Sequence, residues 1–197
     1  VLNKIDNPEM LINYPKKSMN NFDSFDLLIL TIDSLASNFL PLKQAHDDSG
    51  ISTIIKTLTD VGSNDIEDIR NYITDAYNNW NIEYVLIGGD DDVVAAPILW
   101  VEGLDEGTTP YEDFMPSDLY YACLDGTYNY DGDNKWGEPT DGEDGGDVDL
   151  YADVFVGRAC VDNIGDVNDF VSKTVAYINK DPQAQYLSNA CFVGEYM

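Results

Sequence analysis

The sequence has 197 residues, which suits one domain or one and a half, and 44% of them are hydrophobic, enough for a core and against global disorder. Acidic residues outnumber basic ones by 37 to 10, and the formal charge of −27 argues against nucleic acid and anionic membranes, because their phosphates would be repelled. The charge suits metal ions or basic peptides as partners, and it equally suits a secreted or salt-adapted surface. No apolar run reaches the roughly 18 residues that span a membrane.

The first part of the chain alternates strand-like and helix-like segments. Residues 1–24 read as a linker or leader rich in Asn, Pro and Lys. Residues 27–32 are a short, continuous apolar run, which predicts a strand buried on both faces. A helix is predicted at residues 38–48, ended by Gly50. Residues 51–58 are rich in Ile and Thr and predict a second strand.

The next helix has the clearest pattern in the sequence. Ser63 or Asn64 caps it, and Glu67 lies where a capping box needs it. Its apolar side chains recur at spacings of three and four, as in a helix with one buried face: Ile66, Ile69, Tyr72, Ile73, Ala76, Tyr77 and Trp80. Residues 84–88 predict a third buried strand. Strands that alternate with helices in this way form a parallel sheet with right-handed crossovers.

The second part of the chain is less regular. Residues 97–101 predict a short strand or a turn, and residues 118–122 predict a strand. Residues 125–149, which we call the acidic loop, hold seven Asp, two Glu and six Gly against a single Lys. Three regular elements are predicted after the acidic loop: a buried strand at residues 154–158, a helix at residues 164–180 capped by Asn163, and a strand at residues 190–194.

The acidic loop carries the spacing of a calcium site. Six residues are the candidate ligands: Asn129, Asp131, Asp133, Lys135, Glu138 and Asp141. The first three occupy positions one, three and five of a calcium-loop register, where alternate residues of a tight turn direct oxygens at one centre. Position twelve is Thr140 and not the bidentate Glu of an EF-hand, so the later acidic residues would complete the shell. The alternative is a flexible acidic insertion without an ion.

A second acidic group directly follows the predicted strand at residues 84–88. Ligands in open α/β sheets bind beyond the carboxyl ends of strands, so Asp90 and Asp92, on either side of Asp91, are secondary metal candidates. A receiver-like magnesium pocket would add Asp33 from the end of the first strand, but no lysine matches that pattern. A solvated loop or a second structural cation is the preferred interpretation.

The sequence offers no catalytic pair of its own. His46 is the only histidine, and it lies at the edge of the buried face of the helix predicted at residues 38–48, whereas a triad base belongs at a strand end or loop. Cys123, Cys160 and Cys191 are widely spaced and have no obvious reason to approach His46. Three buried free thiols are favoured, and one disulfide plus a free thiol is the alternative.

Four stretches occur in a characteristic order: Asp26-Leu27-Leu28-Ile29-Leu30-Thr31 with its following helix; Tyr84-Val85-Leu86-Ile87-Gly88-Gly89-Asp90; Ser117-Asp118-Leu119-Tyr120-Tyr121-Ala122 with Asp131-Gly132-Asp133; and Val154-Phe155-Val156-Gly157-Arg158 with its following helix. Each stretch alone is a weak signal. In series, with the acidic loop between the third and the fourth, they are fairly specific and cover most of residues 25–180. In this order the sequence resembles the gingipain-type cysteine peptidases of the caspase and legumain clan.

The resemblance implies a caspase-like fold, which is a mainly parallel sheet flanked by helices in two side-by-side subdomains, with secretion and calcium binding. Residues 25–115 would then be the first α/β subdomain, and residues 116–197 the start of the second, catalytic one. A catalytic His-Gly and a catalytic Cys are also implied, each at a strand end C-terminal to the matching part. Asp153 matches the acidic third member that would orient the imidazole, unless it is a strand-edge Asp facing water. Asp162 loosely matches an acidic pocket residue for basic substrates.

The preferred hypothesis is the N-terminal portion of a secreted, gingipain-like cysteine endopeptidase, extracellular or at the cell surface, that acts on peptides or proteins. Its His and Cys would come from the remaining C-terminal catalytic segment, so this chain alone should be inactive. Calcium is the expected cofactor, with no organic one. A non-enzymatic, calcium-stabilised cell-surface or adhesion module on the same fold is the alternative. A magnesium-dependent receiver or hydrolase-like domain is a weaker third hypothesis.

Overall fold

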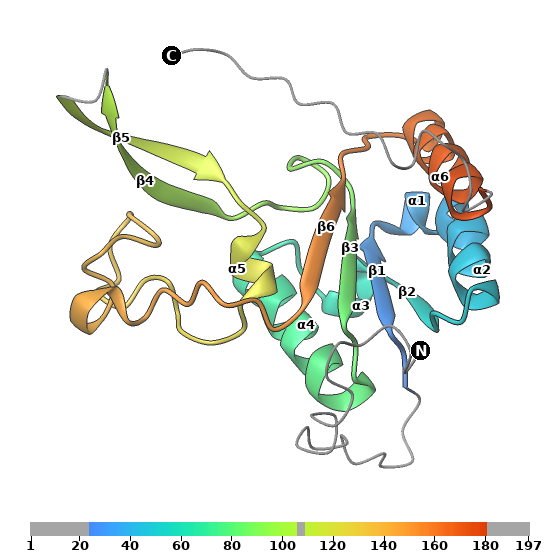
Figure 1. Ribbon diagram of the computed structural model, residues 1–197, viewed down its shortest axis with the longest axis horizontal. Helices are drawn as coiled ribbons and strands as arrows, with labels where there is room; N and C mark the ends of the chain where they lie inside the picture. The colour runs from blue at the N-terminus through green and yellow to red at the C-terminus, as the bar shows by residue number, and fades with distance from the viewer. Residues whose placement is uncertain (1–23, 106–108, 181–197) are drawn as a thin grey trace, which may run out of the picture.

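The computed structural model describes residues 24–105 and 109–180. A four-stranded parallel sheet in the order β2-β1-β3-β6 lies at its centre (Figure 1). The strands are β1 (Leu27–Thr31), β2 (Thr53–Thr57), β3 (Tyr84–Gly88) and β6 (Phe155–Ala159). Each falls within a residue or two of a strand predicted from the sequence, and the predicted parallel α/β sheet is confirmed.

Helices cover both faces of this sheet (Figure 1). α2 (Leu40–Asp48) and α6 (Ile164–Ile178) lie side by side over one face, and α4 (Ile66–Trp80) lies over the other. Asn163 caps α6 as predicted, and its Oδ1 accepts hydrogen bonds from Gly165 N at 2.9 Å and Asp166 N at 3.2 Å. No helix in residues 24–105 and 109–180 combines the length and the apolar character needed to cross a membrane.

The segment between β1 and β2 becomes helical at Asp33, earlier than the predicted start at residue 38. It consists of α1 (Asp33–Ala36), a 3₁₀ turn η3 (Ser37–Phe39) and then α2. Pro41 stands in the first turn of α2, where its missing N–H needs no partner. A proline in the interior of one continuous helix would remove a hydrogen bond, so a tightened 3₁₀ turn just before it is a physically reasonable solution.

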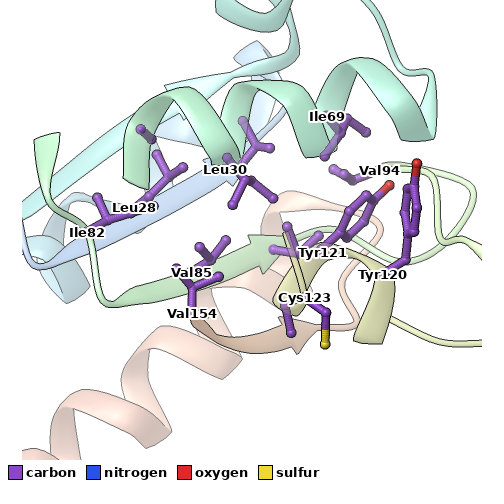
Figure 2. Close-up of a cluster of buried hydrophobic side chains, with 14 of the residues drawn as sticks. Leu28, Leu30, Ile69, Ile82, Val85, Val94, Tyr120, Tyr121, Cys123 and Val154 are labelled. Atoms are coloured by element: carbon purple, nitrogen blue, oxygen red, sulfur yellow. The ribbon is translucent and has the colours of Figure 1, made fainter. Parts of the chain in front are cut away.

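β1 supplies side chains to two cores. Leu28 and Leu30 face α4 and join Ile69 in one cluster, which Figure 2 shows. Leu27 and Ile29 face the opposite way, into the cluster beneath α2 and α6. All five residues of β1 are buried. Successive side chains of a strand point to opposite faces, so a strand covered on both sides must be apolar at every position.

The N-terminus of α4 corrects one prediction. The capping residue is Asp65, whose side chain accepts a hydrogen bond from Glu67 N at 2.9 Å. Ser63 Oγ accepts instead from Asp65 N at 2.9 Å, and Asn64 Oδ1 accepts from Ala95 N at 3.0 Å. Asn64 is therefore a link to the loop after β3, which a local capping rule cannot reveal.

Replacing Asp65 with alanine should lower the free energy of unfolding by about 1 kcal/mol, because an orphan N–H of the first helical turn loses its acceptor. Urea unfolding followed by circular dichroism measures the change. Asp75→Ala is the matched control, since Asp75 is exposed on the same helix and the charge change is equal. Its effect should stay within about 0.5 kcal/mol. Equal effects of the two substitutions would refute the capping role.

An antiparallel hairpin follows β3. It pairs β4 (Ile98–Asp105) with β5 (Thr109–Pro116) and extends away from the central sheet (Figure 1). The sequence predicted only a short strand or turn at residues 97–101. Both faces of the hairpin carry exposed side chains, such as Phe114 and Met115, so neither face shows the alternation that marks a half-buried strand.

The strand predicted at residues 118–122 is wrong, because this segment is a single helical turn, α5 (Leu119–Ala122). Three consecutive side chains, Tyr120, Tyr121 and Ala122, are all buried. The turn also brings the Cys123 carbonyl oxygen to Arg70 Nη2 at 2.6 Å. A short apolar run does not distinguish a strand from one helical turn, and here long-range packing decides.

Two further predictions concern the chain ends and the division of the domain. Residues 1–23 and the strand predicted at residues 190–194 lie outside the described residues, as does Cys191. The division proposed between residues 115 and 116 coincides with the end of β5. The described residues on either side of it nevertheless share one sheet, since β6 pairs with β3.

Candidate functional site

Aromatic side chains attach the acidic loop to the core. Tyr128 is fully buried and packs edge-to-face on Tyr120 of α5, with ring centroids 5.4 Å apart. Trp136 packs on the same ring at 5.5 Å. Tyr128 adopts a φ of 63°, which residues other than glycine rarely do, and its carbonyl accepts a hydrogen bond from Gly137 N at 2.8 Å. This packing disfavours the alternative of a flexible acidic insertion.

Asp141 organises the acidic loop from within. Its side chain is fully buried and accepts hydrogen bonds from Tyr130 N at 2.8 Å, Gly137 N at 3.0 Å and Glu138 N at 3.1 Å. Its carbonyl accepts from Asp147 N at 3.0 Å. The sequence placed Asp141 among the candidate ligands, but backbone donors already satisfy its carboxylate. These contacts favour a role for Asp141 in holding the loop backbone.

Three of the remaining candidate ligands come together. Carboxylate oxygens of Asp131, Asp133 and Glu138 lie within 4.8 Å of one another. Asn129 donates Nδ2 to the Asp133 carbonyl at 3.1 Å, while its Oδ1 is buried without a hydrogen-bond partner. Buried polar atoms are seldom left unpaired, and a hard cation beside Asn129 would satisfy this one. The donors present are the oxygen ligands that calcium prefers.

Lys135 lies within the same calcium-loop register as Asn129, Asp131 and Asp133, but its side chain points toward the hairpin. Nζ forms an ion pair with Glu112 of β5 at 2.8 Å and lies 5.5 Å from the centre of the Trp100 ring. The hydrogen bond to Glu112 raises the pKa of Lys135. An ammonium group cannot ligate a cation, so Lys135 can contribute only its backbone carbonyl to a metal site. Its side chain ties the acidic loop to the hairpin.

Asp153 lies at the base of the acidic loop, beside the amino end of β6. Its Oδ2 accepts a hydrogen bond from Leu124 N at 2.8 Å, and its N donates to the Ala122 carbonyl at 2.9 Å. Carboxylate oxygens of Asp153, Asp125 and Asp149 lie within 4.8 Å of one another. Because the sheet is parallel, this is the edge opposite to the one where its strands end.

The carboxyl edge of the sheet holds the second acidic group around an arginine whose side chain is 11% exposed. Arg158 of β6 forms a fork with Asp118, with Nε–Oδ2 at 2.9 Å and Nη2–Oδ1 at 2.7 Å. Its Nη1 also donates to the carbonyls of Gly89 at 2.9 Å and Val94 at 2.7 Å. The loop that begins at Asp90 is therefore held in place from the neighbouring strand.

The secondary metal candidates do not form a three-carboxylate cluster within the described residues. Asp90 Oδ1 accepts from Asp91 N at 2.9 Å, a local turn contact. Asp33 accepts from the Thr59 hydroxyl, and hydroxyl donors from Thr57 and Thr59 lower its pKa. These contacts favour the solvated loop over a receiver-like pocket.

Two hollows open at the carboxyl edge, and Cys160 lines both. One, of about 260 Å³, is lined by Asp90, Asp91, Ala96, Pro116, Ser117, Asp118, Arg158 and Cys160. The other, of about 510 Å³, is lined by Cys160, Val161, Asp166, Asp169, Phe170, Lys173 and Thr174. Asp162 follows Val161 and is exposed. Its pKa is raised by loss of solvent and by the charges of the neighbouring acidic residues, Asp92 first.

No described cysteine is placed beside the histidine. The His46 carbonyl accepts a hydrogen bond from Ile51 N at 2.9 Å, which places it near the start of β2 and so at the amino edge. Burial lowers the pKa of His46. Cys160 is exposed at the carboxyl edge, and Cys123 is buried beneath the acidic loop, where burial raises the pKa of its thiol. Nucleophilic catalysis needs thiol and imidazole in hydrogen-bond contact.

Sequence patterns alone did not single out two largely buried arginine side chains, those of Arg70 and Arg158. Arg70 donates to three backbone carbonyls at the start of the acidic loop, those of Cys123, Asp125 and Gly126. One signal for Arg70 was present: it falls at a spacing of four and three between Ile66 and Ile73, on the apolar face of α4. Arg158 gives a comparable signal, because it is a charged residue within a strand that is otherwise predicted to be buried.

Comparison with known proteins gives a consistent result. The profile of peptidase family C25 matches residues 20–197. No protein of curated function matches the sequence significantly. Among solved structures, the complex of the pro- and mature domains of Porphyromonas gingivalis RgpB is similar, with a TM-score of 0.53, 17% identity, and coverage of 77% of this chain and 29% of that one.

Two further solved structures are similar. The Arg-specific cysteine proteinase gingipain R matches with a TM-score of 0.51, 18% identity, and coverage of 83% of this chain and 30% of that chain. Dimeric latent PorU from Porphyromonas gingivalis matches with a TM-score of 0.56, 16% identity, and coverage of 91% and 18%. The chain thus spans less than a third of the length of these relatives, and such identities establish the shared fold alone.

Proposed function

The chain belongs to peptidase family C25, and on this premise we propose that it is the N-terminal portion of a gingipain-like cysteine endopeptidase whose catalytic histidine and cysteine come from another segment. We further propose that the full protein acts on peptides or proteins outside the cell or at its surface. The observation that carries the proposal is the family profile that matches residues 20–197, and among the described residues His46 and Cys160 lie at opposite edges of one sheet. A thiolate–imidazole pair cannot form between them.

Peptide hydrolysis by the full-length protein tests this proposal. We expect hydrolysis that a thiol alkylator abolishes, and none from residues 1–197 alone. The full-length Cys160→Ser variant is the control, because it lacks this exposed thiol: it should keep its activity, and the alkylator should still abolish that activity. A full-length protein that is folded, binds calcium and hydrolyses no peptide would favour the alternative of a calcium-stabilised surface module.

The acidic loop is the second part of the proposal. We assign a calcium ion to Asn129, Asp131, Asp133 and Glu138, with Lys135 contributing at most its carbonyl. The proposal rests on the clustered carboxylates and on the unpartnered Asn129 Oδ1. A bound cation would neutralise the mutual repulsion of these carboxylates and brace the loop against the core. Its role in this chain would be structural, since the ligands lie on the acidic loop and away from both hollows.

Calcium should raise the melting temperature. At a hundredfold excess over the dissociation constant, binding to the native state adds about 2.7 kcal/mol to the free energy of unfolding. Each added kcal/mol raises the melting temperature by roughly 2–4 °C in a chain of this size. Calorimetry in calcium and in chelator measures the shift. The Asp131→Asn, Asp133→Asn variant should lose it. Glu143→Gln, Asp144→Asn removes two charges from the same loop outside the cluster and should retain it. An identical melting temperature in calcium and in chelator would refute the site.

Asp153 remains the candidate third catalytic member from the resemblance. Its position at the amino edge, with Oδ2 on Leu124 N, supports a role in the base of the acidic loop more directly. Asp153→Asn in the full-length protein separates the two roles. A loss of kcat at unchanged melting temperature would support the catalytic role, and a lower melting temperature at unchanged kcat would support the structural one.

A further inference from the structure

Arg70 carries a buried charge that no described carboxylate neutralises. The residue is 9% exposed, and its guanidinium donates to three backbone carbonyls. Nε and Nη2 both reach the Cys123 carbonyl, at 3.1 and 2.6 Å. Nη2 also reaches the Asp125 carbonyl at 2.8 Å, and Nη1 reaches that of Gly126 at 2.8 Å. Burying a cation is costly unless its donors are well satisfied, so these contacts strongly constrain the three carbonyls.

The same guanidinium packs against the aromatic side chains that anchor the acidic loop. It lies 4.3 Å from the ring centre of Tyr120 and 5.7 Å from that of Tyr128. Figure 2 shows Tyr120 on α5 and Cys123, the residue just after α5, beside the core that α4 covers. Cation–π attraction of this kind strengthens when the cation is shielded from water. Arg70 thus fixes both the backbone and the first buried ring of the loop.

The first ligand of the proposed calcium site follows at once along the chain. Asn129 is the residue after Tyr128, whose uncommon φ of 63° is held by the packing described above. At Gly126, φ is +70° and an added Cβ would lie 2.1 Å from the Asp147 carbonyl oxygen, so the two ends of the loop are in close contact here. By binding these carbonyls, Arg70 therefore helps to fix the position of the Asn129 backbone.

We propose that Arg70 is a positioning residue of the acidic-loop cation site, which sets the affinity for the ion without contacting it. The inference rests on the proposed calcium site. Carboxylates that repel one another bind an ion tightly only if the backbone already holds them together, and site rigidity is one determinant of calcium affinity. The planar fork of arginine is what allows one side chain to bind three carbonyls at once.

Terbium, a luminescent substitute for calcium, tests this on the whole chain, because Trp136 within the loop can sensitise its emission. Titration gives a dissociation constant, and competition with calcium confirms the site. Arg70→Met should weaken terbium and calcium binding roughly tenfold or more, the scale seen when residues supporting metal ligands are removed. Arg70→Lys retains the charge but not the fork, and should recover only part of the affinity.

A matched control separates positioning from general destabilisation. Leu42→Ala creates a cavity in the cluster beneath α2 and α6, on the opposite face of the sheet, and should lower the melting temperature without changing the dissociation constant. If Arg70→Met does not fold, Arg70→Lys carries the comparison. Wild-type affinity in the folded Arg70 variants, or an equal loss of affinity in Leu42→Ala, would overturn the positioning role alone. No saturable terbium binding by the wild-type chain would overturn the calcium site itself.

Discussion

Replacing Asp141 with asparagine should lower the free energy of unfolding by about 3 kcal/mol, one of the largest effects expected in this chain. The buried carboxylate accepts hydrogen bonds from the N–H groups of Tyr130, Gly137 and Glu138. Bonds to a charged acceptor are each stronger than neutral ones, and an asparagine would turn an NH₂ group toward at least one donor, leaving buried N–H groups unpaired. Urea unfolding in the presence of chelator measures the loss.

The chelator distinguishes the two roles that Asp141 can have. If Asp141 holds the backbone, the loss persists when no cation is bound. If it were a ligand, as the sequence first indicated, the loss would vanish in chelator and appear only with calcium. Asp144→Asn is the control, because Asp144 is exposed on the same loop and the substitution changes the charge by the same amount. Its effect should remain within about 0.5 kcal/mol.

The central sheet was predictable because burial on both faces leaves a local mark. β1 and β3 are short apolar runs, and the helices between them repeat their apolar side chains at helical spacing. The hairpin and α5 leave no such mark. The described side chains of β5 within residues 111–116 are all exposed and Leu99 is the buried side chain of β4, while α5 is one turn whose end is bound by Arg70, 49 or more residues earlier in the chain.

In the candidate site, too, local contacts could be predicted from the sequence and long-range contacts could not. The cluster of Asp131, Asp133 and Glu138 was predictable because all three residues lie close together in the sequence of the acidic loop, so their spacing alone brings them together. The role of Asp141 was not, since its partner Tyr130 is eleven residues away. The position of Asp153 just before β6 follows from the predicted strand, but its hydrogen bond from Leu124 N, 29 residues away in the chain, does not.

Replacing Arg158 with methionine should destabilise the protein by roughly 3–5 kcal/mol, the scale for removing one partner of a buried ion pair. The side chains of Arg158 and Asp118 are only 11% and 21% exposed, so Asp118 would lose its partner largely out of contact with water. The carbonyls of Gly89 and Val94 would also lose their donor. Lys173→Met, which removes an exposed cation from α6, is the matched control and should be nearly neutral.

The cause of this loss can be resolved further. Adding Asp118→Ala to the Arg158 variant should cost less than the sum of the two single changes, because each single change already breaks the same pair. Arg158→Lys preserves the charge beside Asp90 but cannot bind Asp118 and the strand-end carbonyls together. If lysine restores most of the stability, the charge is what matters. We expect lysine to restore little of the stability, because the guanidinium fork is what joins β6, α5 and the loop after β3. Faster amide exchange at residues 89–95 in both Arg158 variants would show that this loop has been released.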